Sequence, residues 1–74
     1  MKVTIAGARV SAGLTQQELA DKIGVSRSTV IAWENGKTPM RMPYFIAFCA
    51  VTGFDEGDII LPSQSTESKQ EANA

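Results

Sequence analysis

Residues 14–37, LTQQELADKIGVSRSTVIAWENGK, contain the side chains best suited to recognising another molecule. Arg27, Ser28 and Thr29 follow one another there and supply hydrogen-bond donors, including the forked guanidinium of arginine. Catalysis has little support, because the chain has no histidine and no carboxylate pair or glycine-rich phosphate loop beside a nucleophile. The single cysteine, Cys49, cannot form an internal disulfide, and no metal-ligand cluster accompanies it. The residue types predict a binding protein without enzymatic activity, metal or cofactor.

Two short helices joined by a tight turn would position these donors. Thr15 is a good N-cap, and Glu18 three residues later completes a capping box for the first of them. This amphipathic helix should end at Gly24, because glycine tolerates the left-handed conformation found at helix C-termini. Ser26 should then cap a second helix, from residue 27 to about residue 35. The spacing is that of a helix-turn-helix.

The second helix of this pair has two different faces. Val30 and Trp33 should be buried, together with the stem of Glu34. Because a short turn makes two short helices cross steeply, the N-terminal half of the second helix should be exposed. That geometry suits insertion into a DNA major groove. The face opposite the buried one carries Arg27, Ser28, Thr29 and Ala32.

The rest of the chain predicts three more helices. Residues 2–12 place apolar side chains on one helical stripe, and residues 38–43 form a loop because two prolines interrupt the helical pattern. A fourth helix should begin at Pro43 and end at Gly53. Asp55 is expected to cap a short fifth helix.

The predicted fold class is therefore all-α, a compact five-helix domain over residues 1–61. After Pro62 the only apolar residue is alanine, so residues 62–74 should form a disordered polar tail. Four apolar residues after the fourth helix could either support self-association or complete the core of the monomer: Phe54, Ile59, Ile60 and Leu61.

The charge of the chain is polarised, although its net value is only −1. Residues 1–43 hold six basic and three acidic residues, a net +3, whereas residues 44–74 hold one basic and five acidic residues, a net −4. The basic part contains the helix-turn-helix, which suits a polyanionic partner. The longest apolar run, residues 44–51, is too short to span a membrane, and no secretory segment is evident. We expect a cytoplasmic protein without a membrane partner.

Four runs of residues resemble a known family. Residues 13–16 (GLTQ), 18–20 (ELA), 24–26 (GVS) and 33–37 (WENGK) are similar to the lambda-repressor-like DNA-binding domain of phage repressors, Cro proteins and Xre-type regulators. The resemblance covers roughly residues 5–61. It implies a sequence-specific transcriptional regulator, of the phage or mobile-element repressor type, that binds double-stranded operator DNA. One such domain makes few contacts, so a homodimer is expected at least on DNA.

The resemblance also implies roles for individual residues. The base-contacting positions are Arg27, Ser28, Thr29 and Ala32. The resemblance places phosphate contacts at Gln16, Asn35 and Lys37, with Arg41 as a further contact. Thr15 and Ser26 are also predicted phosphate contacts, because the helix N-termini there present unpaired backbone amides. Arg9 on the first helix and Glu34 would form a structural ion pair. The fork of Arg27 suits guanine O6 and N7, and a phosphate contact from the same side chain is the open alternative.

A protein-binding module of the same fold, such as an antitoxin or antirepressor, is the alternative function. The near-neutral net charge favours this alternative, and it would bring a protein partner. The polar face of the second helix favours DNA, because Arg27, Ser28 and Thr29 are free of acidic neighbours on that face.

Overall fold

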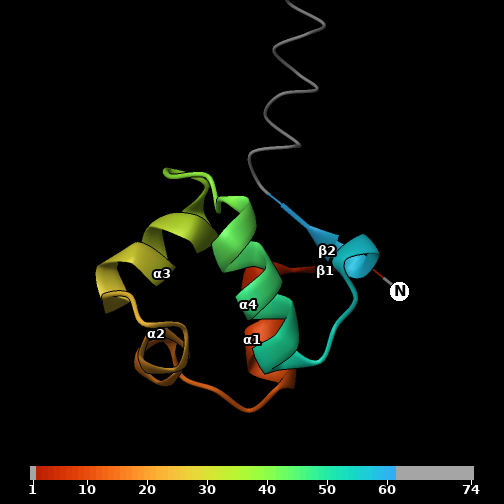
Figure 1. The fold of residues 1–74 in the computed structure, drawn as a ribbon, viewed down its shortest axis with the longest axis horizontal. Helices are drawn as coiled ribbons and strands as arrows, with labels where there is room; N and C mark the ends of the chain where they lie inside the picture. The colour runs from red at the N-terminus through yellow and green to blue at the C-terminus, as the bar shows by residue number, and fades with distance from the viewer. Residues whose placement is uncertain (1, 62–74) are drawn as a thin grey trace, which may run out of the picture.

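The computed structural model describes residues 2–61, and this part of the chain is mostly helical. Strands β1 and β2 pair in parallel, so the two ends of the described chain meet beside the helices (Figure 1). The elements follow in the order β1 (Val3–Thr4), α1 (Ile5–Ser11), α2 (Gln16–Ile23), α3 (Arg27–Asn35), α4 (Met42–Thr52), a 3-10 turn η1 (Glu56–Asp58) and β2 (Ile59–Ile60).

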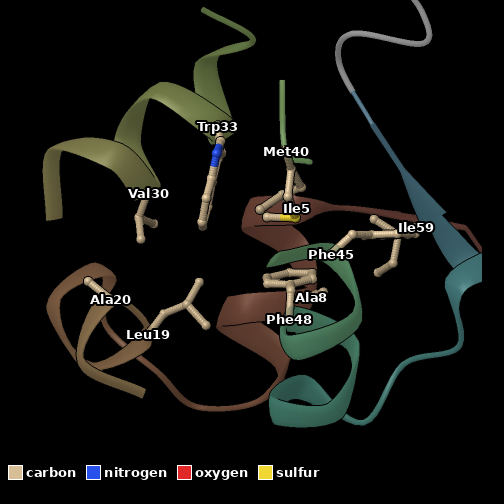
Figure 2. Close-up of a cluster of buried hydrophobic side chains, with 10 residues drawn as sticks. All are labelled: Ile5, Ala8, Leu19, Ala20, Val30, Trp33, Met40, Phe45, Phe48 and Ile59. Carbon is tan, nitrogen blue, oxygen red and sulfur yellow. The ribbon is translucent and has the colours of Figure 1, made fainter. Parts of the chain in front are cut away.

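One hydrophobic core joins the four α-helices, the loop before α4 and β2 (Figure 2). Val30 and Trp33 bury the inner face of α3, as predicted, because their transfer out of water stabilises that packing. Met40 also enters the core, although the sequence predicted only a loop around it. Because Val30 and Trp33 face the core, the opposite face of α3 is turned outward. The buried apolar side chains are Ile5, Ala8, Leu19, Ala20, Val30, Trp33, Met40, Phe45, Phe48 and Ile59.

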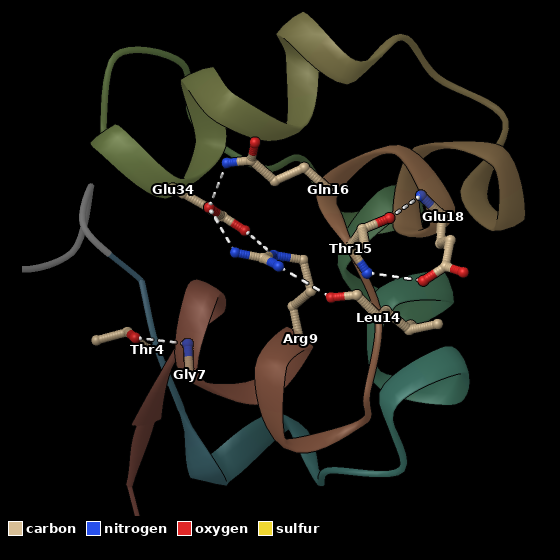
Figure 3. Close-up of polar contacts among 8 residues, drawn as sticks. All are labelled: Thr4, Gly7, Arg9, Leu14, Thr15, Gln16, Glu18 and Glu34. Carbon is tan, nitrogen blue, oxygen red and sulfur yellow. Dashed lines mark hydrogen bonds and ion pairs between the residues drawn. The ribbon is translucent and has the colours of Figure 1, made fainter.

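Polar side chains and a glycine set the boundaries of α2 and α3. The backbone N–H of Glu18 donates to Thr15 Oγ1 at 3.0 Å, and the N–H of Thr15 donates to Glu18 Oε1 at 2.9 Å (Figure 3). These two bonds confirm the predicted capping box. Gly24 ends α2 with φ of +93°, and Ser26 Oγ accepts from the N–H of Thr29 at 3.2 Å. The predicted helix-turn-helix is confirmed.

The predicted fifth helix is present only as the three-residue 3-10 turn η1, which follows Asp55, so five α-helices are not confirmed. Asp55 makes no side-chain capping bond, and its carbonyl accepts from the N–H of Asp58 at 2.9 Å to close a single turn. The chain is extended again at Ile59, with φ of −97° and ψ of 128°, and Ile59 pairs with Val3. β-Branched side chains favour such pairing, and the partner strand lies at the other end of the chain. The described chain is thus mostly helical, with two strands of two residues each pairing its ends.

Two helix starts also differ from their predicted positions. The first helix begins at Ile5 and not at residue 2, because Thr4 Oγ1 caps it by accepting from the N–H of Gly7 at 2.9 Å. The fourth helix begins at Met42, one residue before Pro43, which still lies in the first turn where its missing N–H is harmless.

The apolar residues after α4 mainly complete the monomer core. Ile59 is 5% exposed, and Phe54 and Leu61 pack against the core while half-buried. Ile60 is more open, with 38% of its surface exposed. The predicted disordered tail, residues 62–74, lies outside the described residues.

Candidate nucleic-acid interface

The outward face of α3 is open at its N-terminal end. Arg27 and Ser28 are exposed, whereas Thr29 and Ala32 are half-buried at the edge of the same face. The Thr29 hydroxyl lies 3.0 Å from the Ser26 hydroxyl, so part of its hydrogen-bonding capacity is used inside the protein. The guanidinium of Arg27 provides a fixed fork of N–H donors at the surface. This turn of α3 is therefore the part best placed to contact another molecule.

Glu34 holds α3 against the two preceding helices (Figure 3). Arg9 on α1 donates from Nε to Glu34 Oε2 at 2.6 Å and from Nη2 to Glu34 Oε1 at 3.4 Å. Its remaining nitrogen, Nη1, donates to the Leu14 carbonyl at 2.9 Å, and Gln16 Nε2 on α2 donates to Glu34 Oε1 at 3.1 Å. The Arg9 and Glu34 side chains are only 14% and 8% exposed. The cluster therefore connects α3 to α1 through Arg9 and to α2 through Gln16.

The first turns of α2 and α3 differ as sites for a phosphate. The Thr15 and Ser26 hydroxyls cap α2 and α3. The first backbone amides of a helix have no intrahelical partner, so the first turn of each helix can donate hydrogen bonds to a phosphate. At α2 the Glu18 carboxylate already occupies part of this region. The first turn of α3 contains no acidic side chain. Gln16, also predicted as a phosphate contact, is half-buried with its amide bonded to Glu34.

The other three predicted phosphate contacts lie at or after the C-terminal end of α3. Asn35 is the last residue of α3, Lys37 follows the left-handed cap residue Gly36, and Arg41 is the residue before α4. All three predicted residues are exposed. Arg41 takes the N-cap position of α4 without a side-chain capping bond. Polar and basic side chains therefore flank α3 at its C-terminal end.

Tyr44 supports α3 in a way that the sequence analysis missed. Its ring centroid lies 5.5 Å from that of Trp33, at an interplanar angle of 42°, so α4 packs an aromatic ring against α3. Tyr44 is nevertheless 41% exposed. The sequence does not reveal this contact, because residues 44–51 are apolar throughout, and one helix cannot bury apolar side chains on every face of a small domain.

The described residues do not form a ligand pocket or a cluster of histidine, cysteine or acidic side chains able to hold a metal ion. Cys49 is half-buried, and burial together with the nearby Glu56 and Asp55 carboxylates raises the pKa of its thiol, which disfavours the reactive thiolate. Between residues 2 and 61, no helix is long and apolar enough to cross a membrane. The candidate site is thus the exposed face of α3 that carries Arg27 and Ser28.

Comparison with known proteins gives a family match over most of the chain. A model of the helix-turn-helix family, of the Cro/C1 type, matches residues 5–59. An uncharacterized HTH-type transcriptional regulator of Methanothermobacter thermautotrophicus is 49% identical over 37 residues, which are 50% of this chain and 54% of that protein. Another, of Archaeoglobus fulgidus, is 43% identical over 49 residues, 64% of this chain and 70% of that protein. The match to the first thus spans about half of that relative's length. No solved structure matches the chain.

Proposed function

The chain belongs to the lambda-repressor-like helix-turn-helix family, and from this membership we propose that it is a sequence-specific DNA-binding transcription regulator. One observation carries the proposal. The face of α3 that exposes Arg27 and Ser28 is opposite the face that buries Val30 and Trp33, and Glu34 fixes the helix to its neighbours. A rigid, protruding helix with donors on its open face fits a major groove.

In the proposed complex, base edges and phosphates are contacted by different residues. Arg27 reads guanine through O6 and N7, a contact worth about 1–3 kcal/mol of discrimination against other bases. Ser28, Thr29 and Ala32 complete the base-reading face, with Ala32 offering an apolar contact suited to a thymine methyl. Phosphates on either side of the groove meet the first amides of α2 and α3, and the exposed residues Asn35, Lys37 and Arg41.

We further propose that the protein acts as a homodimeric repressor of the phage or mobile-element type. One α3 reads only a few base pairs, so useful specificity requires two copies on a two-fold operator, with half-sites about one helical turn apart. Occupying such a site would block transcription. A protein that acts on DNA in this way would be cytoplasmic.

Selection of bound duplexes from a random-sequence DNA pool at moderate salt tests the proposal. We expect enrichment of an inverted repeat by the unaltered chain, and loss of one preferred base position with Arg27→Ala. The variant should retain salt-sensitive binding, because its phosphate contacts remain. Failure of the unaltered, folded chain to enrich any duplex would contradict DNA recognition and favour the protein-binding module of the same fold.

A further inference from the structure

Two hydroxyl groups meet at the start of α3, where the turn from α2 ends (Figure 1). Ser26 Oγ and Thr29 Oγ1 lie 3.0 Å apart, and the Thr29 backbone N–H donates to the same Ser26 oxygen at 3.2 Å. Ser26 is exposed at the N-cap of α3, and Thr29 is half-buried at the edge of the outward face. We call the side-chain hydroxyls of Ser26 and Thr29 the hydroxyl pair. The pair links the capped start of the helix to its proposed base-reading face.

The hydroxyl pair has only one free proton to offer a ligand. Each hydroxyl has one proton and two acceptor lone pairs. At a separation of 3.0 Å, one of the two protons lies between the oxygens, so one proton remains. Either Ser26 offers that proton and Thr29 offers only lone pairs, or the two roles are reversed. The choice between these two states sets the chemistry that Thr29 presents to a base.

A phosphate beside the start of α3 would favour the first state. Phosphate oxygens only accept hydrogen bonds, and a bond to a charged acceptor is roughly twice as strong as one between neutral groups. The exposed Ser26 hydroxyl would therefore give its proton to the phosphate. The Ser26 oxygen would then accept from both the N–H and the hydroxyl of Thr29, which uses both of its lone pairs.

We propose that the hydroxyl pair makes Thr29 a hydrogen-bond acceptor only, so that Thr29 selects a base with an amino group in the major groove. Adenine N6 and cytosine N4 are such donors, whereas guanine O6 and thymine O4 would place an acceptor against an acceptor. A threonine hydroxyl without this partner can contact either kind of edge. The proposal rests on the proposed function, and it adds Ser26 as the residue that positions the Thr29 proton.

The expected preference has a recognisable form. Each base pair carries one amino group and one keto oxygen in the major groove, on opposite strands. An acceptor that faces one strand therefore accepts adenine or cytosine on that strand and disfavours guanine or thymine. Arg27 should impose the opposite preference at its own position, because its donors suit guanine O6 and N7. The contributions of Arg27 and Thr29 can therefore be told apart.

Binding to single-base variants of the duplex enriched from the random pool, measured by fluorescence anisotropy, tests this proposal. Thr29→Val removes the hydroxyl and keeps the shape of the side chain. Ser26→Gly removes the partner hydroxyl with little loss of helix stability, because glycine is tolerated at an N-cap. Ser26→Asp keeps a capping oxygen that accepts from Thr29 but has no proton to donate.

The matched control is Thr52→Val, which makes the same chemical change on α4. The Thr52 hydroxyl is also bonded inside its own helix, since it donates to the Phe48 carbonyl at 2.9 Å. Circular dichroism melts verify that all four variants remain folded. Ratios between duplexes are compared within each variant, so a uniform change in affinity cancels.

We expect the unaltered chain and Thr52→Val to bind adenine and cytosine at one strand position about fivefold or more tighter than guanine and thymine. Thr29→Val should lose this preference. Ser26→Gly should weaken the preference, because the Thr29 hydroxyl can then turn its proton toward a base. Ser26→Asp should keep the preference, although its negative charge weakens binding to every duplex.

Three results would overturn the proposal. They are a Thr29-dependent preference for guanine or thymine, an adenine and cytosine preference that Thr29→Val or Ser26→Gly leaves unchanged, and loss of that preference in Ser26→Asp. Each of these results leaves the proposed function intact, because the unaltered chain still selects a duplex. If the unaltered, folded chain enriches no duplex, the proposed function itself fails, and this proposal fails with it.

Discussion

Among single residues, Glu34 connects α3 to both α1 and α2. Its carboxylate accepts from Arg9 and Gln16, and both charged side chains of the ion pair are largely shielded from water. Removing one charge leaves the other buried without its partner, which costs about 3–5 kcal/mol. We predict that Glu34→Ala lowers the free energy of unfolding by that amount, measured by urea titration.

Two further variants separate the buried charge from general effects on the helix. Asp21→Ala removes a carboxylate that is exposed on α2, and should change the free energy of unfolding by no more than about 0.5 kcal/mol. Arg9→Met/Glu34→Leu removes both buried charges and should regain much of the stability lost in Glu34→Ala. A double variant as unstable as the single one would contradict this account.

Arg27 and Lys37 differ in what they should contribute to DNA binding. We predict that Arg27→Ala reduces discrimination at one base position of the enriched duplex by about 1–3 kcal/mol. Lys37→Ala should instead weaken all duplexes equally, and lower the slope of log affinity against log salt by about 1. Fluorescence anisotropy with single-base variants of the duplex, at several salt concentrations, measures both effects. Uniform weakening by Arg27→Ala would identify Arg27 as a phosphate contact.

At the scale of elements, the start of α3 depends on its cap. Ser26 Oγ accepts from the N–H of Thr29 and also lies against the Thr29 hydroxyl, whereas Ser28 is an exposed residue inside the same turn. We predict that Ser26→Ala lowers the free energy of unfolding by about 1 kcal/mol, because an amide at the helix start loses its acceptor.

Ser28→Ala is the matched control, since it makes the same chemical change two residues away. It should leave stability within about 0.5 kcal/mol, because alanine is a better helix former than serine. Urea denaturation of the two variants side by side measures the difference. Equal effects would show that the Ser26 hydroxyl has no special role at this helix start.

At the scale of the whole molecule, β2 ties the end of the described chain into the core. Ile59 is buried and pairs with Val3, while its neighbour Ile60 is partly exposed. Lys2 Nζ also donates to the Gly57 carbonyl at 2.6 Å, which strengthens the junction of the two chain ends. The short strand β2 thus covers part of the core that the four helices alone would leave exposed to solvent.

We predict that Ile59→Ala lowers the free energy of unfolding by about 2–5 kcal/mol, because it leaves a cavity in the core. Ile60→Ala, the same substitution one residue further along the same strand, should cost less than about 1 kcal/mol because its side chain is partly in water already. Thermal and urea unfolding measure both values. Losses below about 1 kcal/mol for both variants would contradict the prediction and mean that the strand stabilises the fold mainly through its backbone.

The sequence alone determined the helix-turn-helix and the buried face of its second helix. The signals are local: Thr15 with Glu18, Gly24, and Ser26 each act within a few residues of their partners. The helical spacing likewise placed Val30 and Trp33 in the core. The family pattern named Arg9 and Glu34 as partners, since residue types alone do not reveal a contact between residues this far apart.

Only the tertiary structure decided the features that depend on distant segments. The residues around Asp55 form a single turn and then a strand, because Ile59 finds Val3 across the molecule. Met40 fills the core from a loop, and Ile46 stays exposed on a helix whose sequence is apolar all round. Whether a side chain is buried or a strand is paired depends on which distant segments pack against it. Residues near it in the sequence therefore do not determine the outcome.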